Sequence, residues 1–133
     1  MPETLRIFLT MAALLAAHVI ADFGLLIGRT RSRKAVDHEV MQYHLLGHAV
    51  LQGFVLLFML GIAPWLAILL TILTVLLHWG TDYGIWYLYR KKFMADLGLN
   101  PKYWNDYWYW IFVGGEQCCH FLVLGGVACL SVL

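Results

Sequence analysis

Histidines and carboxylates recur at a spacing of four residues in the apolar parts of this sequence. The pairs are His18 with Asp22, His44 with His48, His78 with Asp82, and Glu116 with His120. On a helix, side chains four residues apart lie on nearly the same face, about 6 Å apart along the axis. Each pair therefore predicts two side chains that point in one direction. Imidazole nitrogens and carboxylate oxygens are ligands that suit zinc, iron or manganese.

The segments that carry these pairs are long and apolar enough to cross a bilayer. The chain has 133 residues, of which 62% are hydrophobic and 13% are charged, and its mean hydropathy is +0.73. A bilayer core needs about 20 apolar residues per helix. Four ranges meet this requirement: 5–28, 44–63, 64–89 and 108–133. The sequence thus predicts an all-α integral membrane bundle of four transmembrane helices, with one domain over residues 1–133.

An internal repeat relates the two halves of the chain, residues 1–63 and 64–133. Residues 18–25 and 78–85 both read His-x-x-x-Asp-aromatic-Gly-aliphatic. The His-x-x-x-His pair of the second span corresponds in the same way to the Glu-x-x-x-His pair of the fourth. We therefore expect two pseudo-symmetric helical hairpins, related by an axis along the membrane normal.

Successive helices run in opposite directions, and the order of histidine and acid inverts with them. This predicts one layer of Asp22, Asp82, Glu116 and His44 nearer the first and third connections. A second layer of His18, His48, His78 and His120 lies one helical turn further from them. Ionised carboxylates in hydrocarbon cost several kcal/mol or more unless a cation or a proton compensates them. We predict that the eight residues bind one or two divalent ions, with one of the three carboxylates as a general base. A proton relay or a buried hydrogen-bond network is the alternative.

Basic residues gather in the connections between the predicted helices. Of the nine lysines and arginines, all except Arg6 lie in the first and third connections. The positive-inside rule makes those connections cytoplasmic and both termini non-cytoplasmic. Membrane lipids are the expected partners, and nucleic acid is not. Seven of these basic side chains could bind an anionic headgroup: Arg29, Arg31, Arg33, Lys34, Arg90, Lys91 and Lys92. The sequence is also compatible with a homo-oligomer.

At these motifs the sequence resembles the domain-of-unknown-function 3307 family of small bacterial membrane proteins. The matching residues are His18, Asp22, Phe23, Lys34, His44, His78, Asp82, Gln117 and His120. Two positions depart from the family's pattern, because Glu116 replaces an aspartate and Leu26 stands where a glutamine is usual. The resemblance implies a bacterial inner-membrane location and supports the site, but it implies no reaction. A looser similarity connects the chain to membrane-bound metal-dependent hydrolases.

Several functions remain open at this point. The first is a metal-dependent hydrolase that acts on a lipid or amphipathic substrate at the cytoplasmic face, and an iron-dependent lipid oxidase competes with it. The non-enzymatic class comprises metal-ion transport, metal sensing and a structural metal-binding module. Beside the site, we expect Gln117 to hydrogen-bond the ligands. Cys119 is either an extra ligand or a small residue that packs between helices.

Overall fold

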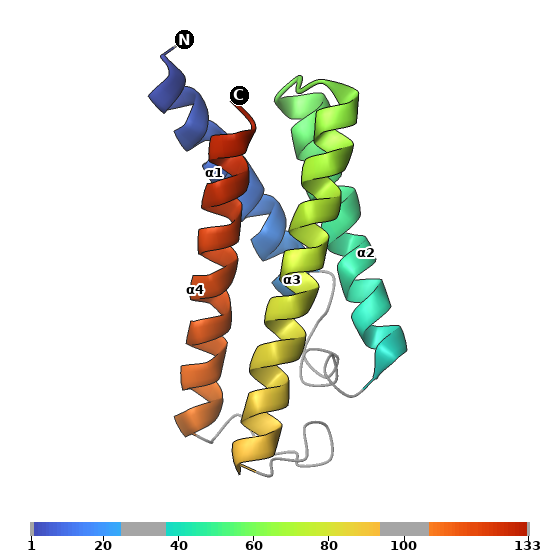
Figure 1. Cartoon of the computed structure of the whole chain (residues 1–133), viewed down its shortest axis with the longest axis vertical. Coiled ribbons are helices and arrows are strands. Elements are labelled where there is room, and N and C mark those ends of the chain that lie inside the picture. Colours follow the sequence, from blue (N-terminus) through green and yellow to red (C-terminus); the bar gives the residue numbers. More distant parts are fainter. Residues whose placement is uncertain (1, 25–36, 94–106, 133) are drawn as a thin grey trace.

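The computed structural model describes residues 2–24, 37–93 and 107–132, and in this part of the chain every regular element is a helix. The elements are α1 (Glu3–Val19), which continues into a π-helical turn η1 (Ile20–Gly24); α2 (His38–Phe54), which continues into a second π-helical turn η3 (Val55–Met59); α3 (Pro64–Phe93); and α4 (Tyr107–Leu130). Figure 1 shows both termini at the same end of the molecule as the α2–α3 connection, so that successive helices alternate in direction.

Four helices have the length and apolar composition needed to cross a membrane: Glu3–Gly24, His38–Met59, Pro64–Tyr89 and Tyr107–Leu130. The predicted all-α fold with four helices of spanning length is therefore confirmed for the described residues. The second helix begins at His38 rather than near residue 44. The carboxylate of Asp37 explains this start, because it accepts hydrogen bonds from the backbone N–H groups of Glu39 and Val40 at 3.1 and 3.3 Å.

The second helix also ends earlier than predicted, at Met59, and a short connection follows it. Gly61 in this connection has a φ of 60°, a left-handed conformation that glycine adopts at little cost. Pro64 then opens α3, where its missing N–H group is no loss. Residues 25–28 and 133, which were predicted to extend the first and fourth spans, lie outside the described residues.

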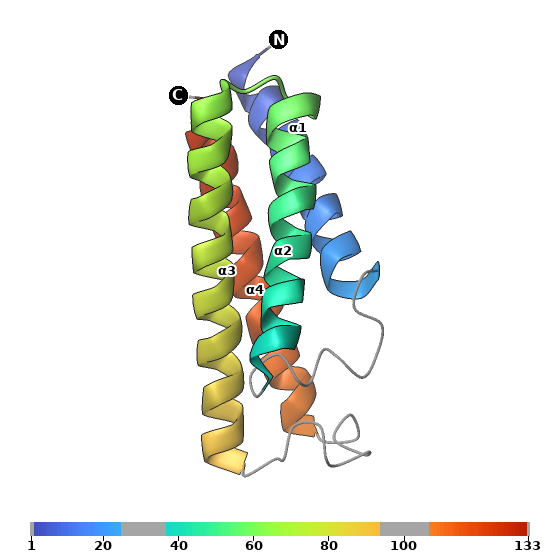
Figure 2. The same cartoon turned by 90° about the vertical axis from the view of Figure 1, so that its right-hand side faces the viewer.

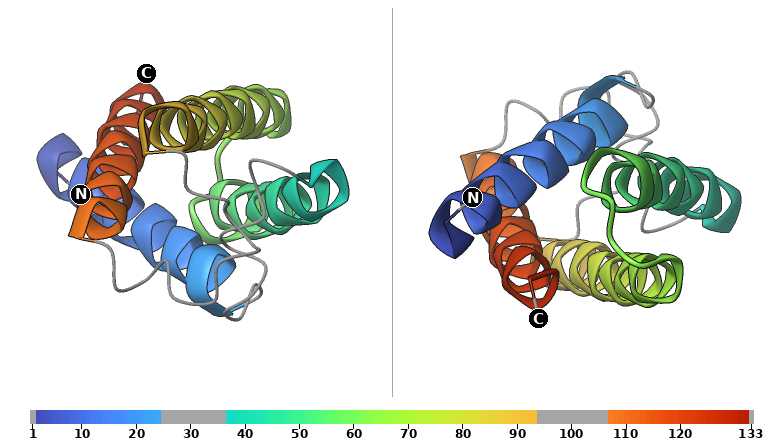
Figure 3. Two further views of the ribbon diagram at one scale, coloured as in Figure 1. Left: turned by 90° about the horizontal axis from the view of Figure 1, so that it is seen from below. Right: turned by 90° about the horizontal axis from the view of Figure 1, so that it is seen from above.

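The four helices form a ring in which α1 packs against α2 and α4, and α3 packs against the same two helices. Figure 3, viewed along the long axis, shows α1 opposite α3 and α2 opposite α4. Figure 2 shows the nearly parallel axes of α2 and α3, whereas Figure 1 shows α1 inclined across the bundle. Opposite placement of the first and third helices is the arrangement expected of two repeated hairpins.

Each helix turns a row of buried side chains at four-residue spacing toward the centre of the ring. The rows are Thr10, Leu14, His18 and Asp22; His44, His48, Gln52 and Leu56; Leu70, Thr74, His78, Asp82 and Trp86; and Glu116, His120, Leu124 and Ala128. In a straight helix with 3.6 residues per turn, such a row drifts by about 40° at each step. The inclination of α1 and the π-helical turns, whose hydrogen bonds close at i+5, offset part of this drift.

The interior of the bundle changes character along its axis. At the end that holds the termini, an apolar core cluster fills the ring, with Leu14, Leu56, Leu70 and Leu124 among its buried members. At the opposite end, an aromatic cluster of Trp86, Tyr89 and Tyr109 lies between α3 and α4 with Val113. The buried histidines and carboxylates lie between the two clusters. The outer surface is apolar, with large exposed hydrophobic side chains on every helix, as expected of a surface that lipid covers.

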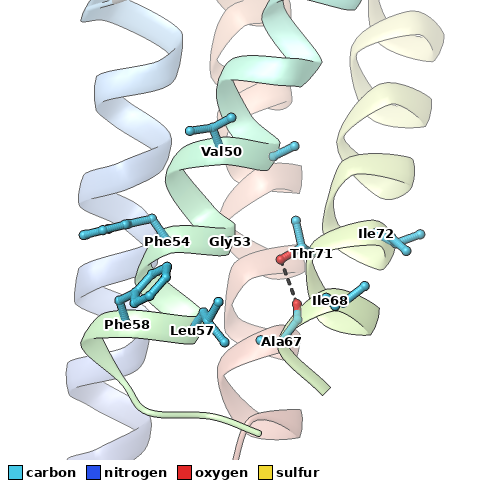
Figure 4. A pocket seen from close by; sticks show the side chains of 10 residues that line it. Val50, Gly53, Phe54, Leu57, Phe58, Ala67, Ile68, Thr71 and Ile72 are labelled. Carbon is cyan, nitrogen blue, oxygen red and sulfur yellow. Dashed lines mark hydrogen bonds between the residues drawn. The ribbon is translucent and has the colours of Figure 1, made fainter. Parts of the chain in front are cut away.

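A groove of about 400 Å³ opens on the outer surface between α2 and α3 (Figure 4). Its lining is apolar except for Thr71, whose hydroxyl group donates to the backbone oxygen of Ala67 at 2.7 Å. Gly53 lines the groove on the α2 side, where a Cβ atom would lie in contact with Thr71 Oγ1 at 3.4 Å. The wall of the groove is therefore apolar, because the hydroxyl group of Thr71 is hydrogen-bonded within its own helix.

Candidate metal centre

The eight residues predicted as metal ligands all lie in the interior of the bundle, where none is more than 2% exposed. Each of the four helices contributes a pair one turn apart. Such complete burial of five histidines and three carboxylates is unusual, because charged groups are rarely buried unless they are paired or bind an ion. The side chains therefore have to satisfy one another or a bound group.

Four imidazole rings form one layer across the bundle, as predicted. The ring centroid of His18 lies 5.0 Å from that of His48 and 4.8 Å from that of His120. The ring of His78 lies 3.9 Å from that of His48 and 4.0 Å from that of His120. One histidine from each helix thus meets at the centre.

The second layer is built from Asp22, Asp82 and His44. The Nε2 atom of His44 lies 3.4 Å from Asp22 Oδ1 and 3.1 Å from Asp82 Oδ2. Glu116, the fourth predicted member, is completely buried and accepts a hydrogen bond at Oε1 from Trp86 Nε1 at 2.9 Å. Trp86 follows Asp82 by one helical turn. The glutamate thus contacts the aromatic end of the site, whereas the two aspartates contact the histidines.

Both aspartates also connect the two layers. Within their own helices, Asp22 Oδ2 lies 3.5 Å from His18 Nε2, and Asp82 Oδ2 lies 3.4 Å from His78 Nε2. Across helices, Nε2 of His48 lies 3.2 Å from Asp22 Oδ1, and Nε2 of His120 lies 3.1 Å from Asp82 Oδ1. Each carboxylate is therefore close to histidines of more than one helix.

Ordinary hydrogen bonding does not account for the surroundings of His44. Its Nε2 atom lies 2.9 Å from Nε2 of His78, in addition to the two aspartate oxygens at 3.1 and 3.4 Å. An imidazole nitrogen carries at most one proton and can serve only one such contact at a time. Two ligand atoms bound about 2.1 Å from the same ion are roughly 3.0 Å apart at octahedral and roughly 3.4 Å apart at tetrahedral angles. The observed separations match those values.

Two sets of buried side chains bring their ligand atoms within 4.8 Å of one another and could hold a metal ion. The first set is Asp22, His44, His48 and His78, and the second is His18, His78 and His120. Asp82 lies outside both sets, although its oxygens are 3.1 Å from His44 and from His120. Glu116 is also outside them. The buried histidine and aspartate cluster can therefore bind metal, whereas the predicted ligand role of Glu116 stays a prediction.

Three further polar side chains hold this cluster in place. Gln117 donates from Nε2 to Asp22 Oδ2 at 2.9 Å, and its Oε1 lies 3.3 Å from His18 Nε2, which agrees with its expected role. Sequence reasoning missed Gln52, whose Nε2 lies 3.3 Å from His48 Nδ1, and Trp86, which binds Glu116. The signal was present, since each lies four residues beyond a predicted ligand. Of these contacts, the one between Gln52 and His48 Nδ1 is of the kind that metal-bound histidines usually make, because it leaves Nε2 free to face the cluster.

Two other expectations from the sequence concern Cys119 and the basic residues. Cys119 is exposed on the outer surface, so it is neither a ligand of the buried cluster nor a residue that packs between helices. The basic residues expected to bind a headgroup lie outside the part of the chain whose side chains are described.

Comparison with families of known sequences gives one result that covers nearly the whole chain. Residues 10–132 match the family described as protein of unknown function (DUF3307). Comparisons with curated proteins and with solved structures find no significant match. The looser similarity to membrane-bound hydrolases therefore stays a prediction from motifs alone. The match includes every residue of the four buried rows, from Thr10 to Ala128. The chain belongs to the DUF3307 family.

Proposed function

We propose that this protein is a membrane-embedded metal-dependent hydrolase that acts on a lipid or another amphipathic substrate. The observation that carries the proposal is the convergence of histidine nitrogens and aspartate oxygens, 2.9 to 3.5 Å apart, in a fully buried layer. A divalent ion would compensate the two carboxylates at this depth. When bound, such an ion activates water for attack and polarises the bond to be cleaved.

Glu116 is the general base in this proposal. The two aspartates are the carboxylates that surround the histidine nitrogens, whereas Glu116 lies beside the cluster, one turn from His120 on the same helix. The indole N–H of Trp86 fixes the position of one carboxylate oxygen. A carboxylate held next to the ligands can accept a proton from water as water attacks the substrate.

The direction of substrate entry follows from the interior packing. The apolar core cluster with Leu14, Leu56 and Leu124 closes the end that holds the termini. The sequence places the basic connections that suit an anionic headgroup at the other end, where the aromatic cluster of Trp86, Tyr89 and Tyr109 packs between α3 and α4. In this proposal the substrate approaches from that end, on the α1–α2 side of the aromatic cluster. We assign this end to the cytoplasmic side of a bacterial inner membrane.

The outer groove between α2 and α3 suits the hydrocarbon part of such a substrate. Ala49 and Gly53, which line it, directly follow His48 and Gln52 of the polar row. The groove and the ligands thus lie on adjacent faces of the same turns of α2, about 100° apart around the helix. A lipid with its headgroup near the basic connections could place an acyl chain there.

A non-enzymatic metal-binding module is the second candidate. It is favoured by the burial of all six residues in the two ligand sets, which leaves a bound ion enclosed by the bundle. A transport path is less well supported, because the apolar core cluster closes one end of the polar layer. The two candidates differ in a single measurable property, which is turnover.

The test uses the full chain purified in detergent, with metal content measured by elemental analysis. Hydrolysis of a panel of phospholipids and lysolipids is then followed with and without a chelator. We expect stoichiometric zinc, iron or manganese, and activity that chelation abolishes and metal restores. The His78→Ala variant should lose both, whereas His38→Ala, at an exposed position, should keep both.

Three outcomes would overturn the proposal. A preparation without transition metal removes the metal centre, and hydrolysis that survives chelation removes the metal-dependent reaction. Bound metal without hydrolysis of any lipid in the panel assigns the protein to the non-enzymatic class.

A further inference from the structure

We infer that the centre binds two divalent ions, that the carboxylates of Asp22 and Asp82 bridge them, and that the matching substrate is a phosphoester. This inference rests on the metal-binding part of the proposed function. The ions would occupy the two ligand sets described above, one centred on the histidines of α2 and the other between α1 and α4. His78 belongs to both sets and lies between them.

The two oxygens of Asp22 face different ligand sets. Oδ1 lies 3.2 Å from His48 Nε2 and 3.4 Å from His44 Nε2, and both histidines belong to α2. Oδ2 lies 3.5 Å from His18 Nε2 of α1, where Gln117 also donates to it at 2.9 Å. One carboxylate thus presents an oxygen to each set.

Asp82 divides its oxygens in the same way. Oδ2 lies 3.1 Å from His44 Nε2 and 3.4 Å from His78 Nε2, which belong to the first set. Oδ1 lies 3.1 Å from His120 Nε2, which belongs to the second. Carboxylates with one oxygen on each of two ions are the usual bridges in two-metal centres, where the ions are about 3.5–4 Å apart.

His120 provides an independent sign of the second ion. Its ring is 2% exposed, and its Nε2 atom makes no hydrogen bond within the described part of the chain. The same atom points into the second set at ligand distance from Asp82 Oδ1. Its ring stacks on that of His78 at 4.0 Å with an interplanar angle of 10°. A buried nitrogen aimed at this position without a hydrogen bond is accounted for by a bound cation.

The internal repeat explains why a second ion site would exist. The correspondence between the hairpins exchanges Asp22 with Asp82, His18 with His78, and His48 with His120. It therefore converts His48 and His78 of the first set into His120 and His18 of the second, and it converts Asp22 into Asp82, which contacts histidines of both sets. The counterpart of His44 is Glu116, which lies outside both sets. A repeat that builds one site around a pseudo-two-fold axis builds its counterpart as well.

The charge of this arrangement favours an anionic substrate. Two divalent ions exceed the charge of the two bridging aspartates, and Glu116 offsets only part of the excess. A phosphoester group brings negative charge to its oxygens, which two ions can bind at once. A neutral carboxylic ester supplies no such charge. The predicted hydrolysis therefore transfers the phosphoryl group to water, so that the P–O bond to the leaving alcohol breaks and that alcohol gains a proton.

The experiment loads the metal-free full chain with Mn²⁺ and combines metal analysis with electron paramagnetic resonance. We expect two ions per chain and the spectrum of an exchange-coupled pair. Addition of inorganic phosphate should change that spectrum, whereas acetate at the same concentration should not. The His120→Ala and His48→Ala variants, one in each set, should each retain one ion and lose the coupling, with His38→Ala as the unchanged control.

The outcomes separate this inference from the proposed function. One ion per chain, with the hyperfine pattern of isolated Mn²⁺, overturns the two-ion centre and leaves the metal-dependent hydrolase intact. Binding of no ion overturns both. Two coupled ions whose spectrum does not respond to phosphate overturn the assignment of a phosphoester substrate. The wild-type measurements decide all three points, even where a variant fails to fold.

Discussion

The two hairpins place buried side chains at corresponding positions, but the side-chain types at some of these positions differ. The hairpin of α1 and α2 contributes His44, where the hairpin of α3 and α4 contributes Glu116. One rung beyond the histidine layer, α2 carries Gln52 and α4 carries Leu124. The repeat thus provides a common frame of histidine and aspartate, and the unequal rungs assign separate tasks. In our interpretation, both hairpins hold the ions, the first adds His44 to the ligands, and the second supplies the base.

The backbone differs between the hairpins as well. Asp22 lies in the π-helical turn η1, whereas its counterpart Asp82 lies in the regular helix α3. Both aspartates nevertheless reach histidines of a neighbouring helix at 3.1 to 3.4 Å. Asp22 thus reaches these histidines from a π-helical turn at the end of the inclined α1. Such turns are frequent at functional sites.

The largest expected effect tests the assignment of the base to the second hairpin. Replacement Glu116→Gln should lower turnover by about 10²- to 10⁴-fold, because general-base catalysis is lost while the amide can still accept from Trp86. Metal content, measured by elemental analysis, should not change. The Glu116→His variant, which copies the rung of the first hairpin, should also bind metal and be inactive. Full activity in either variant would contradict the division of tasks.

The next effect compares the two corresponding histidines of the odd helices. His78→Ala should weaken metal binding by more than about 100-fold, because His78 belongs to both ligand sets, whereas His18→Ala should weaken it by about 10-fold. Competition with a chromophoric chelator measures both affinities. Equal losses in the two variants would mean that the hairpins contribute equally and that His78 is not shared.

A third prediction concerns the position where the first hairpin has the polar Gln52 and the second has Leu124. Gln52→Leu should weaken metal binding by about 10- to 100-fold, because the contact with His48 Nδ1 that orients the ring is lost. The matched change in the second hairpin, Leu124→Met, conserves volume and should leave the affinity unchanged. The same chelator competition applies, and an unaltered affinity in Gln52→Leu would show that packing alone orients His48.

A fourth prediction isolates the hydrogen bond that only the second hairpin makes. Trp86→Phe should lower the free energy of unfolding by about 1–2 kcal/mol, since Glu116 loses a buried donor. Denaturant unfolding in detergent micelles measures this change. Trp79→Phe, on the exposed face of the same helix, is the control and should have no effect. Equal stability of the two variants would refute a supporting role for Trp86.

The smallest effect concerns the groove where the two hairpins meet. Gly53→Leu should fill it and lower the turnover of long-chain substrates by roughly 10-fold, with short-chain turnover and metal content retained. Gly114→Leu, at a position open to the surroundings, is the control. A uniform loss across chain lengths would place the acyl chain elsewhere.

Much of the fold could be predicted from the sequence, because apolar length and four-residue periodicity are local properties. The four helices, the layer of imidazoles and the layer of Asp22, Asp82 and His44 all follow from them. The start of α2 depends on the cap at Asp37, which hydropathy does not detect. The contact of Glu116 with Trp86 depends on how α3 and α4 pack, because spacing fixes the face of a side chain and not its partner across helices. The π-helical turns depend on the same packing.

The apolar core cluster next to the histidine layer also bears on where the ions of the proposed centre would come from. Leu14, Leu56, Leu70 and Leu124 fill the ring at the end that holds the termini, so in the proposed function ions and substrate enter from the opposite end. Occupancy of the centre would then follow the free metal concentration of one compartment. Starving that compartment of metal would switch the protein off, whatever the supply on the opposite side of the membrane.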